Sequence, residues 1–257
     1  MPSSDRKKGV KRSLYHLVLW AISILFFSPI VWMIICSFKT REEILMMPPK
    51  WLFMPSLQNY IGLFERINFS KELMNSIFMS LSAVIIAVLV SFLAAYSFSR
   101  FKPKGTDLIM FLLLSMRMVP AAAVVVPIYL LYAASGWKGT HSGMILFYAM
   151  FSIPFSVWIL KGFIAGVSER FDETALATGG SRMHIIFRLV MPQVKPGLIA
   201  AFIFNIIFVW NEFLFNFIIG GKKTATVPVG LAQGFSAGGA IQWDFIATLT
   251  AFYSLPL

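Results

Sequence analysis

Cysteine, histidine and acidic side chains are scarce in this sequence. It has one cysteine, three histidines and 11 Asp and Glu residues among 257. A single thiol, Cys36, forms no intrachain disulfide, and the scattered histidines make no Cys/His cluster with the spacing of a metal site. No nucleophile with a neighbouring base is recognisable. These absences argue against an enzyme and predict no bound metal.

A motif for binding ATP is also missing. A P-loop requires G-x-x-x-x-G-K-[ST], because the Ser or Thr hydroxyl contacts magnesium. The nearest candidate, Gly221-Lys222-Lys223-Thr224, has Lys223 at that position. We therefore predict no cofactor on this chain, and any ATP and magnesium that drive it are bound by another polypeptide.

Charged residues make up only 13% of the chain, whereas 58% is hydrophobic and the mean hydropathy is +0.77. One soluble domain of this size does not bury so much apolar surface. Several apolar runs approach or exceed the roughly 20 residues that a helix needs to cross a bilayer. The first run is too long for a removed signal peptide and lacks its small-residue cleavage site. The runs span about 14–38, 73–96, 106–131, 143–163, 198–219 and 243–257.

The runs lack the period-2 alternation of a membrane β-barrel, so we predict an all-α membrane protein with six transmembrane helices. A basic N-terminal segment, residues 1–13, precedes a transmembrane domain, residues 14–257. The last run has about 15 residues, and a helix ending inside the bilayer would leave carbonyl groups unsatisfied. We therefore expect the last helix to be truncated and the natural chain to continue for about 20 residues.

The formal net charge of +11 does not indicate a nucleic-acid partner, because the basic residues lie in short segments between apolar runs. With the N-terminus inside, 13 Lys and Arg residues fall in cytoplasmic segments and 8 in outer ones. Positive residues accumulate on the cytoplasmic side, so we predict a cytoplasmic N-terminus.

One long polar insert, residues 165–197 (the 165–197 loop), separates the fourth and fifth runs. Ser168 or Asp172 is placed to cap a short helix that Gly179 and Gly180 end. Ser181 is placed to cap a second helix, which Pro192 and Pro196 stop. The pattern predicts a helix–glycine–helix hairpin, and an amphipathic linker lying on the membrane surface is the alternative.

The 165–197 loop resembles the signature loop of importer-type ABC permeases, roughly E-A-A-x-x-x-G followed about a dozen residues later by I-x-L-P. The matching residues are Glu173, Ala175, Gly179 and Pro192. Thr174 replaces a common Ala, and Thr178 stands where sugar-type members often have Asp. Val190 and Met191 replace the usual residues before the proline.

Further matches in order along the chain resemble carbohydrate permeases related to the smaller maltose permease subunit. They are Ser37-Phe38-Lys39, Arg41-Glu42-Glu43, Pro48-Pro49-Lys50-Trp51, Asn59-Tyr60, Asn75-Ser76, Ala94-Ala95-Tyr96, Arg100-Phe101, Met118-Val119-Pro120 and Trp210-Asn211-Glu212-Phe213.

The resemblance implies a non-catalytic permease subunit of an ATP-driven importer in a bacterial inner membrane, carrying a sugar or related solute. It implies a second permease in a heterodimer, a dimer of ATPase subunits and an extracytoplasmic solute-binding protein as partners, with lipid around the helices. The residues it assigns to ATPase coupling are Glu173, Thr174, Ala175, Thr178, Gly179, Pro192 and Pro196.

Polar residues within the membrane usually face a cavity or a partner. Offsets of 7 and 4 residues place Asn205, Glu212 and Asn216 on one helical stripe, which we expect to face the translocation path or the partner permease. Snorkelling of Glu212 to the interface is the alternative. Arg117 is a candidate partner of Glu212, and Pro120 in the third run suggests a kinked, pore-lining helix.

Two other classes remain open. A secondary transporter driven by an ion gradient would show paired broken helices in two halves and several membrane carboxylates, of which Glu212 is the one clear case. An ABC permease for a non-sugar solute would fit the same motifs. A membrane-embedded enzyme lacks the acid–base or metal set that it would need.

Overall fold

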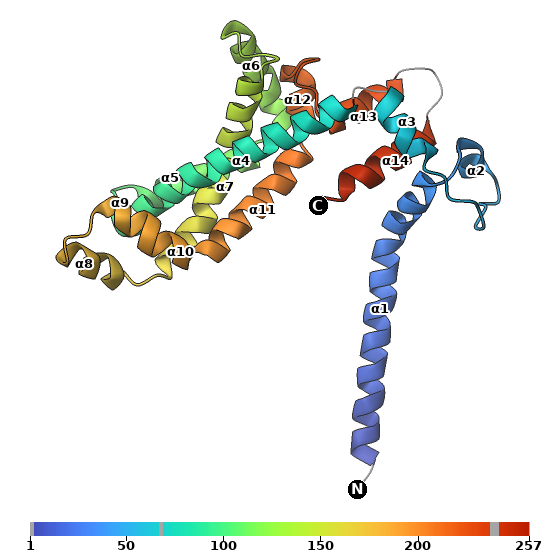
Figure 1. The fold of residues 1–257 in the computed structure, drawn as a ribbon. Coiled ribbons are helices and arrows are strands. Elements are labelled where there is room, and N and C mark those ends of the chain that lie inside the picture. Colours follow the sequence, from blue (N-terminus) through green and yellow to red (C-terminus); the bar gives the residue numbers. More distant parts are fainter. Residues whose placement is uncertain (1–2, 67–68, 237–241, 257) are drawn as a thin grey trace. The chain divides into compact units, whose positions relative to one another are not determined.

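The computed structural model describes residues 3–66, 69–236 and 242–256, which form helices joined by turns and loops, with no strand in these ranges (Figure 1). The all-α prediction is confirmed. Residues 1–2 of the expected N-terminal segment and residue 257 of the last run lie outside the described residues. The chain divides into two compact units, residues 1–69 with 231–257 and residues 70–230. We describe each unit by itself.

The first unit is built around the end of its longest helix. It contains α1 (Ser3–Ser37), α2 (Arg41–Leu45), α3 (Gln58–Arg66) and α14 (Trp243–Ser254). The carbonyl of Ser37 accepts hydrogen bonds from Asn59 Nδ2 of α3 at 3.1 Å and from Thr248 Oγ1 of α14 at 3.2 Å. These bonds satisfy a carbonyl that the end of α1 leaves free, so they join three helices at one point.

The second unit contains the remaining long helices. They are α4 (Phe69–Arg100), α5 (Thr106–Ser115), the 3₁₀ turn η1 (Met116–Met118), α6 (Ala121–Ala134), α7 (His141–Ala165), α11 (Lys195–Trp210) and α12 (Leu214–Ile219). Helix α13 (Val227–Ser236) begins in this unit. On α4 the buried face carries Ala83, Ala87 and Ser91, and Ser91 Oγ donates to the carbonyl of Ile153 on α7 at 3.2 Å. Small residues at this spacing allow close approach of membrane helices. Helix α7 also packs against α5 and α11.

Three helices are long and apolar enough to cross a membrane alone, in the ranges Arg12–Ser37, Phe69–Arg100 and His141–Ala165. Two bent pairs raise the number to five if each pair is one span, and α14 has only 12 residues. Three of the six expected runs are therefore continuous full-length helices among the described residues.

The third expected run is broken rather than kinked. The axes of Thr106–Met118 and Ala121–Ala134 differ by 96°. The break falls at Val119, which is extended, and Pro120, the N-cap of α6. Proline has no N–H to continue the helical ladder and disfavours helical geometry in the residue before it. Pro127 lies inside α6, which continues through it.

The fifth expected run is also broken, because α11 ends at Trp210 and α12 begins at Leu214. Asn211 donates to the carbonyl of Ile207 from both its backbone N–H, at 3.3 Å, and its side chain, at 2.7 Å. Side chains that bond nearby backbone groups compete with helix propagation. The expectation of one helical stripe bearing Asn205, Glu212 and Asn216 is therefore wrong.

Candidate functional site

The first half of the 165–197 loop is helix α8 (Arg170–Ala177), which ends as predicted at glycine. Gly179 has φ +83°, and its N–H donates to Leu176 O at 3.0 Å, while Gly180 N–H donates to Ala175 O at 2.8 Å. This left-handed residue closes the helix, and a side chain there would be strained.

The start of α8 differs from the prediction. Ser168 Oγ accepts only a long 3.4 Å bond from the N–H of Arg170, and Asp172 does not cap the helix. Its carboxylate turns instead toward α4.

In the second half of the loop, Ser181 caps the start of a helix as expected, because its Oγ accepts the N–H of His184 at 3.2 Å. The segment continues as α9 (Arg182–His184), a π-helical turn η2 (Ile185–Val190) and α10 (Met191–Gln193). The prolines do not stop it: Pro192 and Pro196 lie in the first turns of α10 and α11. Their missing N–H groups are harmless there, and the direction changes by 77° between Gln193 and Lys195.

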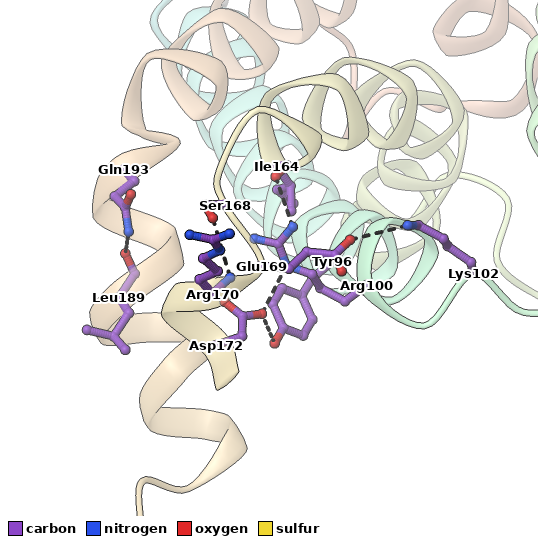
Figure 2. Close-up of polar contacts among 10 residues, drawn as sticks. All are labelled: Tyr96, Arg100, Lys102, Ile164, Ser168, Glu169, Arg170, Asp172, Leu189 and Gln193. Atoms are coloured by element: carbon purple, nitrogen blue, oxygen red, sulfur yellow. Dashed lines mark hydrogen bonds and ion pairs between the residues drawn. The ribbon is translucent and has the colours of Figure 1, made fainter. Parts of the chain in front are cut away.

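A buried ion pair anchors α8 to the end of α4 (Figure 2). Asp172 Oδ2 accepts from Arg100 Nε at 2.9 Å and from the Tyr96 hydroxyl at 2.8 Å. The Arg100 and Asp172 side chains are 6% and 10% exposed. Arg100 also reaches the carbonyl of Ile164 at 3.4 Å. A loop that is polar in sequence is thus fixed to the helical core.

Two outer contacts supplement this anchor. Lys102 Nζ lies 3.2 Å from Glu169 Oε1, with both side chains more than half exposed, so the pair adds little stability. The guanidinium of Arg182 lies 5.1 Å from the centre of the Phe101 ring. The α4 anchor was not predicted. Tyr96 and Arg100, four residues apart on one helical face, were its only sequence signal.

The opposite side of α8 is open. Glu173, Thr174, Thr178 and Gly179 are exposed, as are Pro192 and Pro196, whereas Ala175 is half-buried against the core. Phe171, Leu176 and Met183 are 53%, 39% and 62% exposed. Exposed apolar side chains grouped on an anchored polar loop are typical of a surface that contacts another protein.

Arg117 lies in η1, just before the break at Val119 and Pro120, among apolar side chains. Its Nη2 donates to the carbonyl of Phe151 at 3.2 Å, and its guanidinium lies 4.7–5.3 Å from the rings of Phe151, Phe155 and Phe208. No ion pair joins it to a carboxylate in the described ranges, so the candidate pair with Glu212 is not formed. Aromatic faces stabilise the cation in its place.

Glu212 binds the start of α12. Its carboxylate accepts the N–H groups of Phe215 and Asn216, at 2.8 and 3.1 Å, and the Tyr148 hydroxyl at 3.0 Å. The carboxylate therefore satisfies free N–H groups at a helix end.

The two asparagines are buried and bonded within the chain. Asn205 Nδ2 donates to Ser156 Oγ at 2.6 Å, and Asn216 Nδ2 donates to the carbonyl of Thr224 at 3.0 Å. The contact of these polar residues with a solute or a partner permease stays a prediction.

The apolar helices are those of a multi-pass membrane protein, and the 165–197 loop is anchored to them with one face exposed. The family described as binding-protein-dependent transport system inner membrane component matches residues 87–257, and the chain belongs to this family. It is thus a permease subunit of an ABC transport system, and the resemblance found in the sequence is confirmed.

Curated relatives agree over most of the chain. The probable ABC transporter permease protein y4oR of Sinorhizobium fredii is 29% identical, covering 99% of this chain and 91% of the relative. The diacetylchitobiose uptake system permease protein NgcG of Streptomyces coelicolor is 30% identical, covering 91% and 76%. The trehalose/maltose transport system permease protein MalG of Thermococcus litoralis is 29% identical, covering 98% and 91%.

The fold is similar to that of a solved bacterial ABC transporter involved in the import of the acidic polysaccharide alginate. The TM-score is 0.78 with 16% identity, covering 100% of this chain and 94% of the other. At this identity the likeness establishes the fold alone.

Proposed function

We propose that this chain is one of two different permease subunits that enclose the translocation path of a carbohydrate importer. ATP and magnesium are bound by a partner ATPase dimer, this chain has no catalytic role of its own, and its N-terminus is cytoplasmic. A binding protein delivers the solute to the outer side. The names of the relatives NgcG and MalG support an oligosaccharide or disaccharide as the solute.

The 165–197 loop is the surface to which the ATPase docks. The observation that carries this proposal is the buried Arg100–Asp172 pair, which fixes α8 to α4 while Glu173 and Gly179 stay exposed. A rigid link between an exposed contact surface and a membrane helix is what transmission of movement requires. ATP then drives transport by binding one conformation of the assembly in preference to the other.

A substitution at Gly179 tests the docking. Gly179→Leu introduces a bulky side chain at an exposed position with φ +83°, where a Cβ would meet nothing within 4 Å. We expect this variant to insert into the membrane but to lose copurification with the ATPase and ATP-dependent uptake of sugar.

Gly136→Leu is the matched control, because Gly136 has φ +72°, is equally open and lies in the turn between α6 and α7. It carries the same backbone strain without touching α8. Normal ATPase copurification by Gly179→Leu would refute the docking surface. Uptake that needs an ion gradient and no ATP would indicate a secondary transporter.

A further inference from the structure

Two adjoining cavities lie where α4, α5 and α7 meet, and both are bordered by Ala165, with which α7 ends and the 165–197 loop begins. The first has a volume of about 430 Å³, and its lining mixes apolar residues with polar and charged ones, including Ser99, Lys102, Thr106 and Lys161. The second has a volume of about 580 Å³ and is lined mainly by apolar residues, including Met110, Trp158 and Phe163. Both are bordered by Lys161 and Ala165, so a chamber that carries charged side chains (the polar chamber) adjoins a mainly apolar one (the apolar chamber).

The chambers lie near the ends of apolar helices, where the edge of a bilayer is expected. Thr106 begins α5, and Lys161 lies four residues before the end of α7, so the polar chamber lies at the ends of two apolar helices. The apolar chamber follows α7 inward past Trp158, which is 51% exposed. Tryptophan beside the end of a membrane helix is typical of the interface between headgroups and acyl chains.

The charge of the polar chamber favours an anion. The lining carries two lysines, Lys102 and Lys161, and one carboxylate, Asp107. Lys102 also contacts Glu169 at 3.2 Å through side chains that are 69% and 54% exposed, a pair that an anion can displace at little cost. In addition, the N-cap residue of α5 is Gly105, which has no side chain to accept the free N–H groups of the first turn.

We propose that this pair of chambers is a binding site for one anionic phospholipid. The phosphate lies between Lys102 and Lys161, and an acyl chain lies along Trp158 and Phe163. A lipid satisfies both chambers at once, whereas a free phosphate would use only the polar one. Basic pockets between membrane helices bind anionic headgroups in this way. The site is separate from the exposed face of α8 and extends beyond the proposed transport function.

Native mass spectrometry of the complex purified through this chain tests the proposal. The probes are dioleoylphosphatidylglycerol, dioleoylphosphatidylcholine and inorganic phosphate. We expect the phosphatidylglycerol to bind in preference to the other two. The single variant Lys161→Gln and the double variant Lys102→Gln/Lys161→Gln should each bind phosphatidylglycerol about fivefold more weakly than the wild type. The control Lys222→Gln, at an exposed lysine between α12 and α13, should leave it unchanged.

A second variant tests the apolar chamber without changing charge. Gly162 lines this chamber, and a Cβ there would meet nothing within 4 Å, so Gly162→Leu fills the space without a clash. We expect it to reduce phosphatidylglycerol binding several-fold, whereas Gly62→Leu, at another open glycine, should not.

Three results would overturn the proposal. Equal binding of the two lipids would remove the role of charge, and binding of inorganic phosphate as tight as that of the lipid would indicate a free-anion site. Absence of phosphatidylglycerol binding to the wild-type complex would mean that a neighbouring subunit fills the chambers.

Discussion

Asp172 joins α8 of the 165–197 loop to α4. One of its oxygens accepts both Arg100 and Tyr96, while Asp172 Oδ1 and Arg100 Nη2 are buried without a partner among the described residues. A buried charge that loses its partner is strongly destabilising, whereas removal of both charges costs much less. The pair therefore determines whether α8 stays on α4.

We predict that Asp172→Ala destabilises the attachment of α8 by about 3 kcal/mol, because Arg100 is left buried and uncompensated. Proteolysis within residues 165–197 of the purified protein should become faster. The double variant Asp172→Ala/Arg100→Leu should lose less than the sum of the two single variants. Glu169→Gln, which breaks only the exposed pair with Lys102, should have little effect. Equal protease sensitivity of Asp172→Ala and the wild type would contradict the anchor.

Ser181 is the second residue on which the loop depends, because its Oγ caps α9. Replacing an N-cap serine by alanine costs about 1 kcal/mol. We predict that Ser181→Ala raises hydrogen exchange of the amides in residues 182–186 about fivefold. Ser168→Ala removes only a 3.4 Å bond and is the control, with no expected change in that segment. Unaltered exchange in Ser181→Ala would show that the cap is unimportant.

At the scale of helices, Pro120 ends the helical hydrogen-bond ladder between α5 and α6, and Arg117 lies just before this break. We predict that Pro120→Ala allows the ladder to continue and partly straightens the pair. Spin labels at Leu108 and Leu130, both about 60% exposed, should then move apart, by about 10 Å if the two helices become collinear.

Pro127→Ala is the matched control for this measurement, since α6 already continues through Pro127. Its label distance should not change. An unchanged distance in Pro120→Ala would mean that packing of α6 against α12, rather than the proline, fixes the bend.

The helices could be predicted from apolar run length, because the bilayer fixes how many residues a span needs. Gly179 and Ser181 were also predictable, since their roles depend on local backbone geometry. The breaks at Pro120 and Asn211 were not, because apolar composition continues through both. The Arg100–Asp172 pair joins residues 72 positions apart, and the spacing of Tyr96 and Arg100 on α4 does not identify Asp172 as their partner. The sequence also could not show that Arg117 and Glu212 do not pair. In the folded chain Arg117 lies against aromatic rings, and Glu212 accepts two backbone N–H groups and the Tyr148 hydroxyl.

At the scale of the whole molecule, we propose a permease subunit that is coupled to an ATPase on another chain through α8. In this proposal the exposed face of α8 contacts the ATPase, and the buried attachment to α4 passes the movement to a membrane helix. Loss of the anchor in Asp172→Ala should therefore reduce coupled transport even where the ATPase still binds.

The central claim is contact between α8 and an ATPase, and site-directed cross-linking measures it directly. The chain has one cysteine, Cys36, which is buried in α1, so Cys36→Ser gives a background without thiols. A cysteine introduced as Thr178→Cys or Glu173→Cys should cross-link to the ATPase in the membrane through a short thiol-to-amine reagent. Lys222→Cys, which lies between α12 and α13, should not. Cross-linking from Lys222→Cys but not from Thr178→Cys or Glu173→Cys would contradict the account.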